Sequence, residues 1–260
     1  MVTPKLGLSM LYCLGEPFQK MTDRLIETTT QYIEIVDDGF HELNRQRVAV
    51  LKEIGVSQGL KYSVHAPFAD VNIASPSSSL RRAMMRRLQR SIMYAQALDA
   101  YVWVFHPGTK TGISSFYPGV DWLQNLNSVQ SLAKVAEESG VTIAIENVPE
   151  PYPGLMKSVK DFEEFYAQFR GDMGMVLDVG HSNVNGQTES FIRAFSDKIV
   201  HMHLSDNDGS GDQHLGIGQG TIDWGRLAAL MREISYDKTA VVESVERVDE
   251  SLLKLKRLFV

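Results

Sequence analysis

Short apolar runs rich in β-branched residues alternate with amphipathic stretches along the whole chain. The short runs are nearly continuous in apolar character, which is typical of strands buried on both faces. They cover residues 5–9, 32–36, 61–65, 102–106, 142–147, 175–178, 199–204 and 240–243. Between them, apolar residues three or four apart predict helices near residues 20–30, 44–55, 79–98, 122–138, 159–169, 188–195, 224–234 and 249–258. Eight predicted strands therefore alternate with eight predicted helices.

This alternation favours an α/β protein folded as one (β/α)8 TIM barrel. Strands that are buried on both faces and separated by helices form parallel sheets, and eight such units close a barrel. A length of 260 residues suits one barrel, and no Pro-, Ser- or Gly-rich linker divides residues 1–260 into two domains. An open doubly wound sheet is the alternative, but residues 10–16 lack the glycine-rich turn that such a sheet places after its first strand.

Six consecutive predicted strands, from the third to the eighth, end in a residue that can bind a metal ion. These residues are His65, His106, Glu146, Asp178, His203 and Glu243. The C-terminal ends of the strands carry the active site in a barrel of this kind, so these side chains are expected to converge. Buried carboxylates at short range repel one another unless cations lie between them. The pattern therefore predicts a site for divalent metal ions.

Three further candidate ligands lie in predicted loops just beyond the strand ends. His181 follows Asp178 by three residues, and Asp212 and His214 form an Asp-x-His pair that can hold one ion from two sides. We expect all three to contact metal or substrate, because six strand-end ligands converge beside them.

Two other polar residues lie on predicted strands. His201 shares a strand face with His203 but lies one layer deeper, so it is interpreted as a barrel-core residue that supports the ligands. Glu34 is expected to support the ligands in the same way or to contact substrate. The glycines from Gly216 to Gly220 lack the strand-turn-helix context of a nucleotide-binding loop and are expected to let the backbone pass close to the metal site.

Composition narrows the choice of ligands and partners. Cys13 is the only cysteine, which excludes intrachain disulfides and thiolate zinc sites and favours a cytoplasmic protein. No apolar run reaches the roughly 18 residues of a membrane span. A net charge of −6 gives no general attraction to nucleic acid. The five arginines between residues 81 and 90 are expected to form the solvated face of an outer helix, with Leu80, Met84, Leu88 and Ile92 as its buried stripe.

Taken together, the candidate ligands resemble those of the xylose isomerase-like superfamily of TIM barrels, over about residues 32–243. The superfamily contains metal-dependent sugar and sugar-phosphate isomerases and epimerases, and also the endonuclease IV class of nucleases that act at apurinic/apyrimidinic (AP) sites. In the epimerase branch four strand-end residues hold one divalent ion, and their matches here are Glu146, Asp178, His203 and Glu243. In the nuclease branch nine side chains hold three zinc ions, and their matches are His65, His106, Glu146, Asp178, His181, His203, Asp212, His214 and Glu243.

Individual segments resemble both branches. The sequence HAPFADVNIASP at residues 65–76, followed by an arginine-containing helix and HPG, resembles the nucleases, whereas SDNDG at 205–209 and GQGTIDW at 218–224 resemble the epimerases. Many nucleases carry a Lys shortly after the residue equivalent to Asp206. In this chain the first Lys after Asp206 is Lys238. Many epimerases carry an Arg where Gly209 stands here. The loop after Asp178 is short for a DNA-inserting enzyme.

The resemblance implies an isomerase or epimerase acting on a small carbohydrate by proton transfer next to a metal-polarised carbonyl. Glu146 and Glu243 would exchange the proton, and His181 and Glu34 would bind sugar hydroxyls. One to three divalent ions are expected, with Zn²⁺ favoured over Mn²⁺, Co²⁺ or Mg²⁺. The alternatives are a zinc-dependent AP endonuclease, whose partner would be DNA, and a catalytically silent metal-dependent binding protein. No membrane partner is expected, and the sequence leaves open whether the protein is an oligomer.

Overall fold

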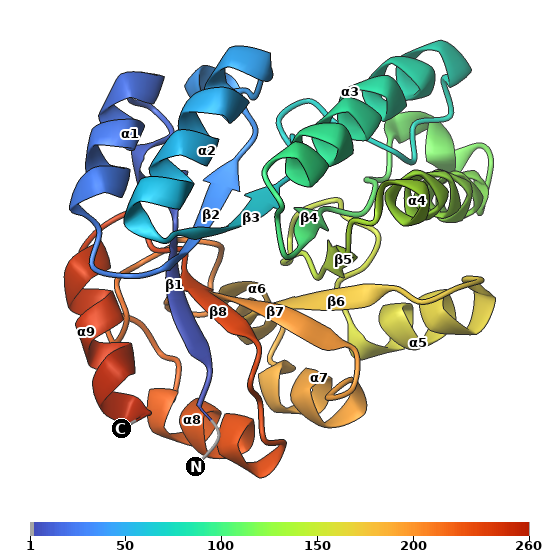
Figure 1. The fold of residues 1–260 in the computed structure, drawn as a ribbon. Helices are drawn as coiled ribbons and strands as arrows, with labels where there is room; N and C mark the ends of the chain where they lie inside the picture. The colour runs from blue at the N-terminus through green and yellow to red at the C-terminus, as the bar shows by residue number, and fades with distance from the viewer. Residues whose placement is uncertain (1–2, 260) are drawn as a thin grey trace.

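The computed structural model describes residues 3–259, which form a closed (β/α)8 barrel (Figure 1). All neighbouring strands are parallel, and β1 pairs with β8 to close the ring. The strands are β1 (Lys5–Ser9), β2 (Tyr32–Val36), β3 (Lys61–His65), β4 (Trp103–Phe105), β5 (Ile143–Glu146), β6 (Gly174–Asp178), β7 (Ile199–Leu204) and β8 (Thr239–Val242). The TIM barrel predicted from the hydrophobic pattern is therefore confirmed. Every predicted strand lies within one residue of the observed bounds.

Helices cover the outside of the barrel, and α9 packs against β1 and β8 where the ring closes (Figure 1). They are α1 (Phe18–Glu27), α2 (Arg45–Gln58), α3 (Ser78–Ala97), α4 (Val120–Ser139), α5 (Val159–Gln168), α6 (Val179–Val184), α7 (Thr188–Ala194), α8 (Trp224–Glu233) and α9 (Val248–Leu258). Three short 3₁₀ helices, η1 (Met10–Cys13), η2 (Gly39–His41) and η3 (Gly112–Ser115), lie in loops on the C-terminal side of the strands. No helix among residues 3–259 has the length and apolar character needed to span a bilayer.

The short helix α6 corrects the expectation that Asp178 is followed by a loop. Asp178 caps this helix, because its side chain accepts a hydrogen bond from the backbone N–H of His181 at 2.6 Å. His181, which was expected in a loop, therefore lies in α6. Six residues are too few to show a helical period in the sequence.

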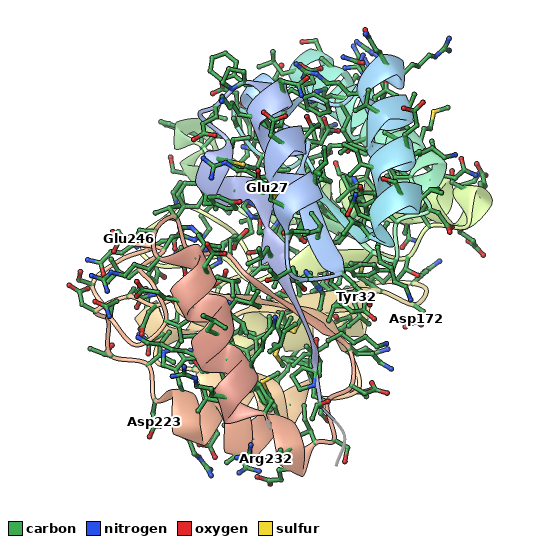
Figure 2. The ribbon with its side chains drawn as sticks, turned by 60° about the vertical axis from the view of Figure 1, so that its left-hand side comes forward. Glu27, Tyr32, Asp172, Asp223, Arg232 and Glu246 are labelled. Atoms are coloured by element: carbon green, nitrogen blue, oxygen red, sulfur yellow. The ribbon has the colours of Figure 1, made fainter. Side chains whose placement is uncertain are left out.

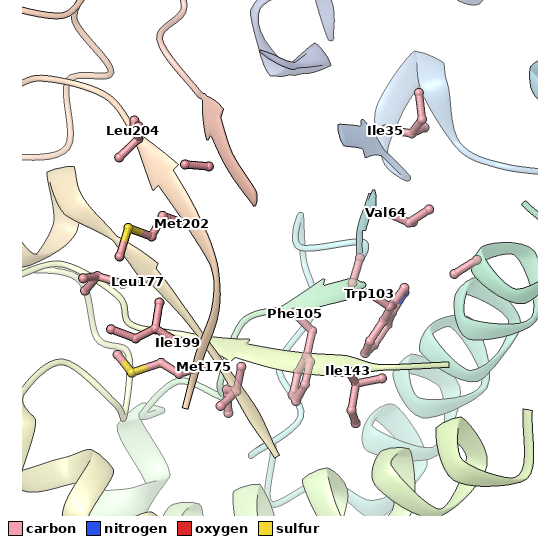
Figure 3. Packing of buried hydrophobic residues seen from close by; sticks show 14 of the residues in the cluster. Ile35, Val64, Trp103, Phe105, Ile143, Met175, Leu177, Ile199, Met202 and Leu204 are labelled. Atoms are coloured by element: carbon pink, nitrogen blue, oxygen red, sulfur yellow. The ribbon is translucent and has the colours of Figure 1, made fainter. Parts of the chain in front are cut away.

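Alternate residues of each strand face two different environments. Residues on the outward face pack against the helices and form the main core, which includes Trp103 and Phe105 stacked with ring centroids 5.2 Å apart (Figure 3). The indole N–H of Trp103 donates to the Ser91 hydroxyl of α3 at 3.0 Å, which fixes that helix against β4. Inside the barrel the apolar cluster is small and comprises Val102, Val104, Ala144 and Val176. The rest of the interior is available for polar side chains.

The outer helices present charged side chains, as Figure 2 shows for the side formed by α1 and α9. The arginines of α3 follow the expected solvated face only in part. Arg87 is largely covered, and its guanidinium donates to the backbone carbonyl of Asp37 at 3.0 Å and to its carboxylate at 3.2 Å. Of the residues expected in the buried apolar stripe, only Leu88 and Ile92 are buried. Leu80, near the start of the helix, is 57% exposed.

Candidate metal centre

All nine side chains identified as candidate ligands gather at the C-terminal ends of the strands. Seven of them line a cavity of about 830 Å³, and Asp178 and His203 lie beneath its floor. The strands deliver these residues because inward-facing positions alternate with outward-facing ones, so that the last inward residue of each strand points into the barrel mouth. The nine residues fall into three groups, each with ligand atoms within 4.8 Å of one another.

The central group consists of the four residues Glu146, Asp178, His203 and Glu243, all of which are buried. His203 Nδ1 lies 3.2 Å from Glu146 Oε1, 3.1 Å from Glu243 Oε2 and 3.9 Å from Asp178 Oδ2. Glu146 Oε2 and Asp178 Oδ2 are buried and accept no hydrogen bond within residues 3–259. Buried carboxylate oxygens without donors are costly unless a cation compensates them. This donor set therefore fits a divalent ion.

Two further groups flank the centre. His65 Nε2 and His106 Nε2 lie 3.4 and 3.3 Å from Glu146 Oε2, so this carboxylate is shared with the central group. On the other side, His181 Nε2 and His214 Nε2 lie 3.2 and 3.1 Å from Asp212 Oδ2. Imidazole nitrogens combined with carboxylate oxygens are a ligand set that suits Zn²⁺. The geometry can accommodate one ion at the centre or additional ions in the flanking groups.

Backbone carbonyls set the ring orientation of three histidines. The Nδ1 atoms of His65, His181 and His214 lie 2.9, 2.7 and 2.9 Å from the carbonyl oxygens of Ala66, Asn147 and Glu243. A carbonyl oxygen only accepts, so each Nδ1 carries the proton and each Nε2 faces a carboxylate. Without a metal ion, the raised pKa values of these histidines favour a second proton on Nε2. A metal ion would take its place, with each Nε2 lone pair as a ligand.

Two residues that the sequence pattern did not indicate hold the ligands in position. Asn147 is one of them, because its side chain accepts from the Asp178 backbone N–H at 2.8 Å and donates to the Asp178 carbonyl at 3.0 Å. A polar residue directly after the strand-end ligand Glu146 was the only signal of this role in the sequence. The bridge ties the ends of β5 and β6 together next to the candidate ligands Glu146 and Asp178.

The second residue is Asp206, which organises the loop that carries Asp212 and His214. Its carboxylate accepts from the backbone N–H of Gly218 at 2.8 Å and from the indole N–H of Trp224 at 2.9 Å. A Cβ atom on Gly220 would overlap the Asp206 carboxylate and the Asn207 carbonyl, which requires glycine there. The glycine-rich segment thus allows a close approach to Asp206 and Asn207, the residues after β7, and not to the ligands themselves.

Burial and the neighbouring carboxylates shift the protonation of the ligands in the metal-free protein. Burial alone would lower the histidine pKa values, but contacts with carboxylates raise the pKa of His65 to about 9, that of His181 to about 10 and that of His214 to about 9. The pKa of His203 is likewise raised well above its usual value, chiefly by Glu243. Burial raises the pKa of Asp178 to about 7.

Metal binding is expected to release protons, because the ligands hold them at pH 7 and must lose them to coordinate an ion. Filling the central group should release about one or two protons, from His203 and Asp178, and the affinity should rise with pH. Without metal, the stabilising effect of the raised histidine pKa values is present below about pH 6.5 and is lost as the pH rises through 9 to 10. Titration calorimetry in buffers of different ionisation enthalpy counts the protons. Uptake of protons on binding would contradict this assignment.

The two polar residues expected beside the ligands, Glu34 and His201, are completely buried inside the barrel. His201 lies one layer below His203, as expected from the strand period. Glu34 does not line the cavity and contacts both histidines, with 3.1 Å between carboxylate oxygen and Nε2 in each case. This position is incompatible with the expected contact between Glu34 and a sugar hydroxyl.

Three known proteins illustrate what this chain is similar to. An uncharacterised protein of Methanocaldococcus jannaschii is 31% identical over 258 residues, which cover 98% of this chain and 99% of the relative. A probable endonuclease 4 of Aquifex aeolicus is 29% identical over 179 residues, which are 61% of either chain. The crystal structure of a D-tagatose 3-epimerase-like protein superposes with a TM-score of 0.90 at 28% identity and covers 98% of this chain and 95% of that chain.

The sequence also matches the model of a protein family. The family described as xylose isomerase-like TIM barrel matches residues 26–258, which is most of the chain. The matched region begins before β2 and ends within α9, so it contains all nine candidate ligands. The chain belongs to the xylose isomerase-like TIM barrel family.

Proposed function

We propose that the protein is a divalent-metal-dependent sugar isomerase or epimerase in which Glu146 and Glu243 transfer the proton. The observation that carries this proposal is the pair of buried glutamates at one metal-competent centre, at the bottom of a cavity of about 830 Å³. They come from the ends of β5 and β8, which are separated by β6 and β7. Each places a carboxylate oxygen within 3.2 Å of His203 Nδ1.

The chemistry removes a proton from a carbon next to a carbonyl group and returns it. When bound, a divalent ion at the central group would polarise the carbonyl and lower the energy barrier to formation of an enediolate. One glutamate removes the proton and the other returns it, on the opposite face for an epimerisation. Without metal, contacts with protonated His203 lower the pKa of both carboxyl groups against the effect of burial. A bound divalent ion would take over this role and keep them ionised. His181 and His214 line the cavity, which supports a role for them in binding substrate hydroxyls.

The cavity wall favours an uncharged sugar over a sugar phosphate. No Lys or Arg side chain lines the cavity within residues 3–259. Its rim is instead apolar and includes Leu11, Leu14, Phe68, Val148 and Val245. Phosphate groups are normally bound by Arg, Lys or helix N-termini, and DNA-binding surfaces need several cations. The same wall therefore disfavours a DNA backbone in the cavity.

A zinc-dependent AP endonuclease is the second candidate, and one observation favours it. The flanking groups supply the ligands for ions beyond the central one, namely His65 and His106 with Glu146, and His181 with Asp212 and His214. Several ions held by these residues would supply the Lewis acidity that phosphodiester hydrolysis needs. The likeness to a D-tagatose 3-epimerase-like structure extends over 98% of this chain, against 61% for the probable endonuclease, which supports the first proposal.

The two proposals are separated by parallel assays on protein loaded with Zn²⁺, Mn²⁺ or Co²⁺. The expected result is exchange of a carbon-bound proton for deuterium in an unphosphorylated ketose, together with formation of its epimer. The same preparation is tested for incision of an oligonucleotide that contains one abasic site. Incision of the abasic DNA without proton exchange in the ketose would favour the nuclease proposal over the epimerase proposal. Neither reaction, with metal and sugar still bound, would identify a binding protein.

A further inference from the structure

We propose that Glu34 is a positioning residue, which holds the ring of His203 so that Nδ1 faces the metal centre. This inference rests on the metal centre of the proposed function, although it applies to either chemistry at that centre. Glu34 lies on β2 and is fully buried, on the opposite side of the His203 ring from the other three central ligands. It does not line the cavity, and among the candidate ligands it forms an ion pair only with His203 within the described residues.

His203 is oriented differently from the three histidines whose Nδ1 atoms face carbonyl oxygens. Its Nδ1 faces Glu146 and Glu243, so its Nε2 must carry the proton when Nδ1 binds an ion. Glu34 Oε1 lies 3.1 Å from this Nε2 as an ion-pair contact, and neither atom forms a hydrogen bond to any other group in the described part of the chain. A carboxylate that accepts the distal N–H of a ligating imidazole fixes the ring and strengthens it as a ligand.

The other oxygen of Glu34 is held from two sides. The Ser63 hydroxyl donates to Glu34 Oε2 at 3.1 Å, and His201 Nε2 lies 3.1 Å from the same atom. His201 is fixed in turn by the Thr239 hydroxyl, 2.6 Å from its Nδ1. Ser63 receives a hydrogen bond from the Tyr101 hydroxyl at 3.1 Å. These contacts prevent rotation of the Glu34 carboxylate. The fixed carboxylate in turn restricts rotation of the His203 ring.

Glu34, His201 and His203 also satisfy the spacing of a metal site, since their ligand atoms lie within 4.8 Å of one another. Two observations favour hydrogen bonding over a second ion at this depth. The lone pairs of Glu34 Oε2 already face the Ser63 hydroxyl and the His201 ring, and both His201 nitrogens have partners. An ion here would also have to pass the central group, because all three residues are completely buried. The cluster therefore supports one ion and does not bind another.

The test measures metal affinity and not turnover. In the full-length protein, Glu34→Gln keeps the shape of the side chain but removes its charge, and we expect Zn²⁺ affinity at the central group to fall about 10- to 100-fold. Affinity is measured by competition with a chromophoric chelator, and the number of ions bound at saturation should not change. In the zinc-loaded wild type, ¹⁵N NMR of the His203 ring should show the proton on Nε2.

Tyr62→Phe provides a matched control, because it removes one buried hydrogen bond without touching Glu34. The Tyr62 hydroxyl donates to the Leu51 carbonyl at 2.9 Å, so Tm should fall while Zn²⁺ affinity stays within twofold of the wild type. An unchanged affinity in Glu34→Gln, or an equal loss in both variants, would overturn the positioning role. Fewer ions bound by Glu34→Gln would show that Glu34 is itself a ligand and would also overturn it.

The outcome for Glu34 is distinguishable from the outcome for the proposed function. A wild-type protein that binds a divalent ion but turns over no sugar refutes the epimerase, while the ratio of affinities still decides the role of Glu34. A wild-type protein that binds no divalent ion overturns both proposals.

Discussion

Glu146→Gln and Glu243→Gln are each expected to lower proton exchange on a ketose substrate by about 10²- to 10⁴-fold, the usual contribution of a positioned general acid or base. An amide cannot accept the proton from carbon, although its oxygen can still approach an ion. Deuterium exchange followed by NMR, together with epimer formation, measures the loss. Both variants must be assayed with their metal content determined, because both glutamates belong to the central group.

A matched control for these variants is Glu163→Gln. Glu163 is exposed on α5, so the same chemical change there should leave exchange at the wild-type rate. Full exchange in both Glu146→Gln and Glu243→Gln would exclude their proposed role. Loss in only one of them would indicate that one carboxylate serves both steps, which is the pattern of an isomerase that returns the proton on the same face.

Removal of the metal is expected to abolish activity completely and to lower stability, since protonated His203 alone then offsets the three buried carboxylates of the central group. A ligand that binds only the folded state stabilises it by about 4 kcal/mol when present at 1,000 times its Kd. Dialysis against a chelator, followed by denaturant unfolding with and without added Zn²⁺, measures this difference. An active chelated protein without residual metal would contradict the proposed function.

A variant in one flanking group determines how many ions the site holds. Asp212→Asn weakens only one flanking group, because Asp212 contacts His181 and His214 and not the four central residues. If the centre binds a single catalytic ion, elemental analysis should show the same metal content in this variant as in the wild type. Loss of one of three ions, together with loss of incision at abasic DNA, would instead support the nuclease.

The fold and the convergence of the candidate ligands could be predicted from the sequence because both follow from local periodicity. The two-residue strand period determines which side chains face inward, and this rule identified His65, Glu146 and Asp178 as neighbours across the barrel mouth. The depth of a residue inside the barrel depends in addition on the stagger between strands. Glu34 aligns with Ser63, whereas His65 aligns with Val36, so Glu34 lies one layer below the ligands. No local pattern contains that offset.

Other parts of the site depend on contacts between distant segments. Asn147 acts on the next strand, and Asp206 acts on residues more than ten positions later in the chain. The apolar rim is contributed by loops after several different strands, as Leu11, Val148 and Val245 illustrate. Each of these residues is ordinary within its own segment. Their roles become visible only when the barrel brings the segments together.

The way Asp206 holds its loop has a consequence for protein engineering. Through Gly218 and Trp224, this carboxylate fastens the far end of the loop to its beginning, independently of any ligand. We therefore expect that the loop can be exchanged between homologous barrels together with its contacts to Ser251 and Lys254 of α9, while the central candidate ligands remain at the strand ends. Shuffling this one segment offers a route to change the nuclearity of the site without redesigning the scaffold beneath it.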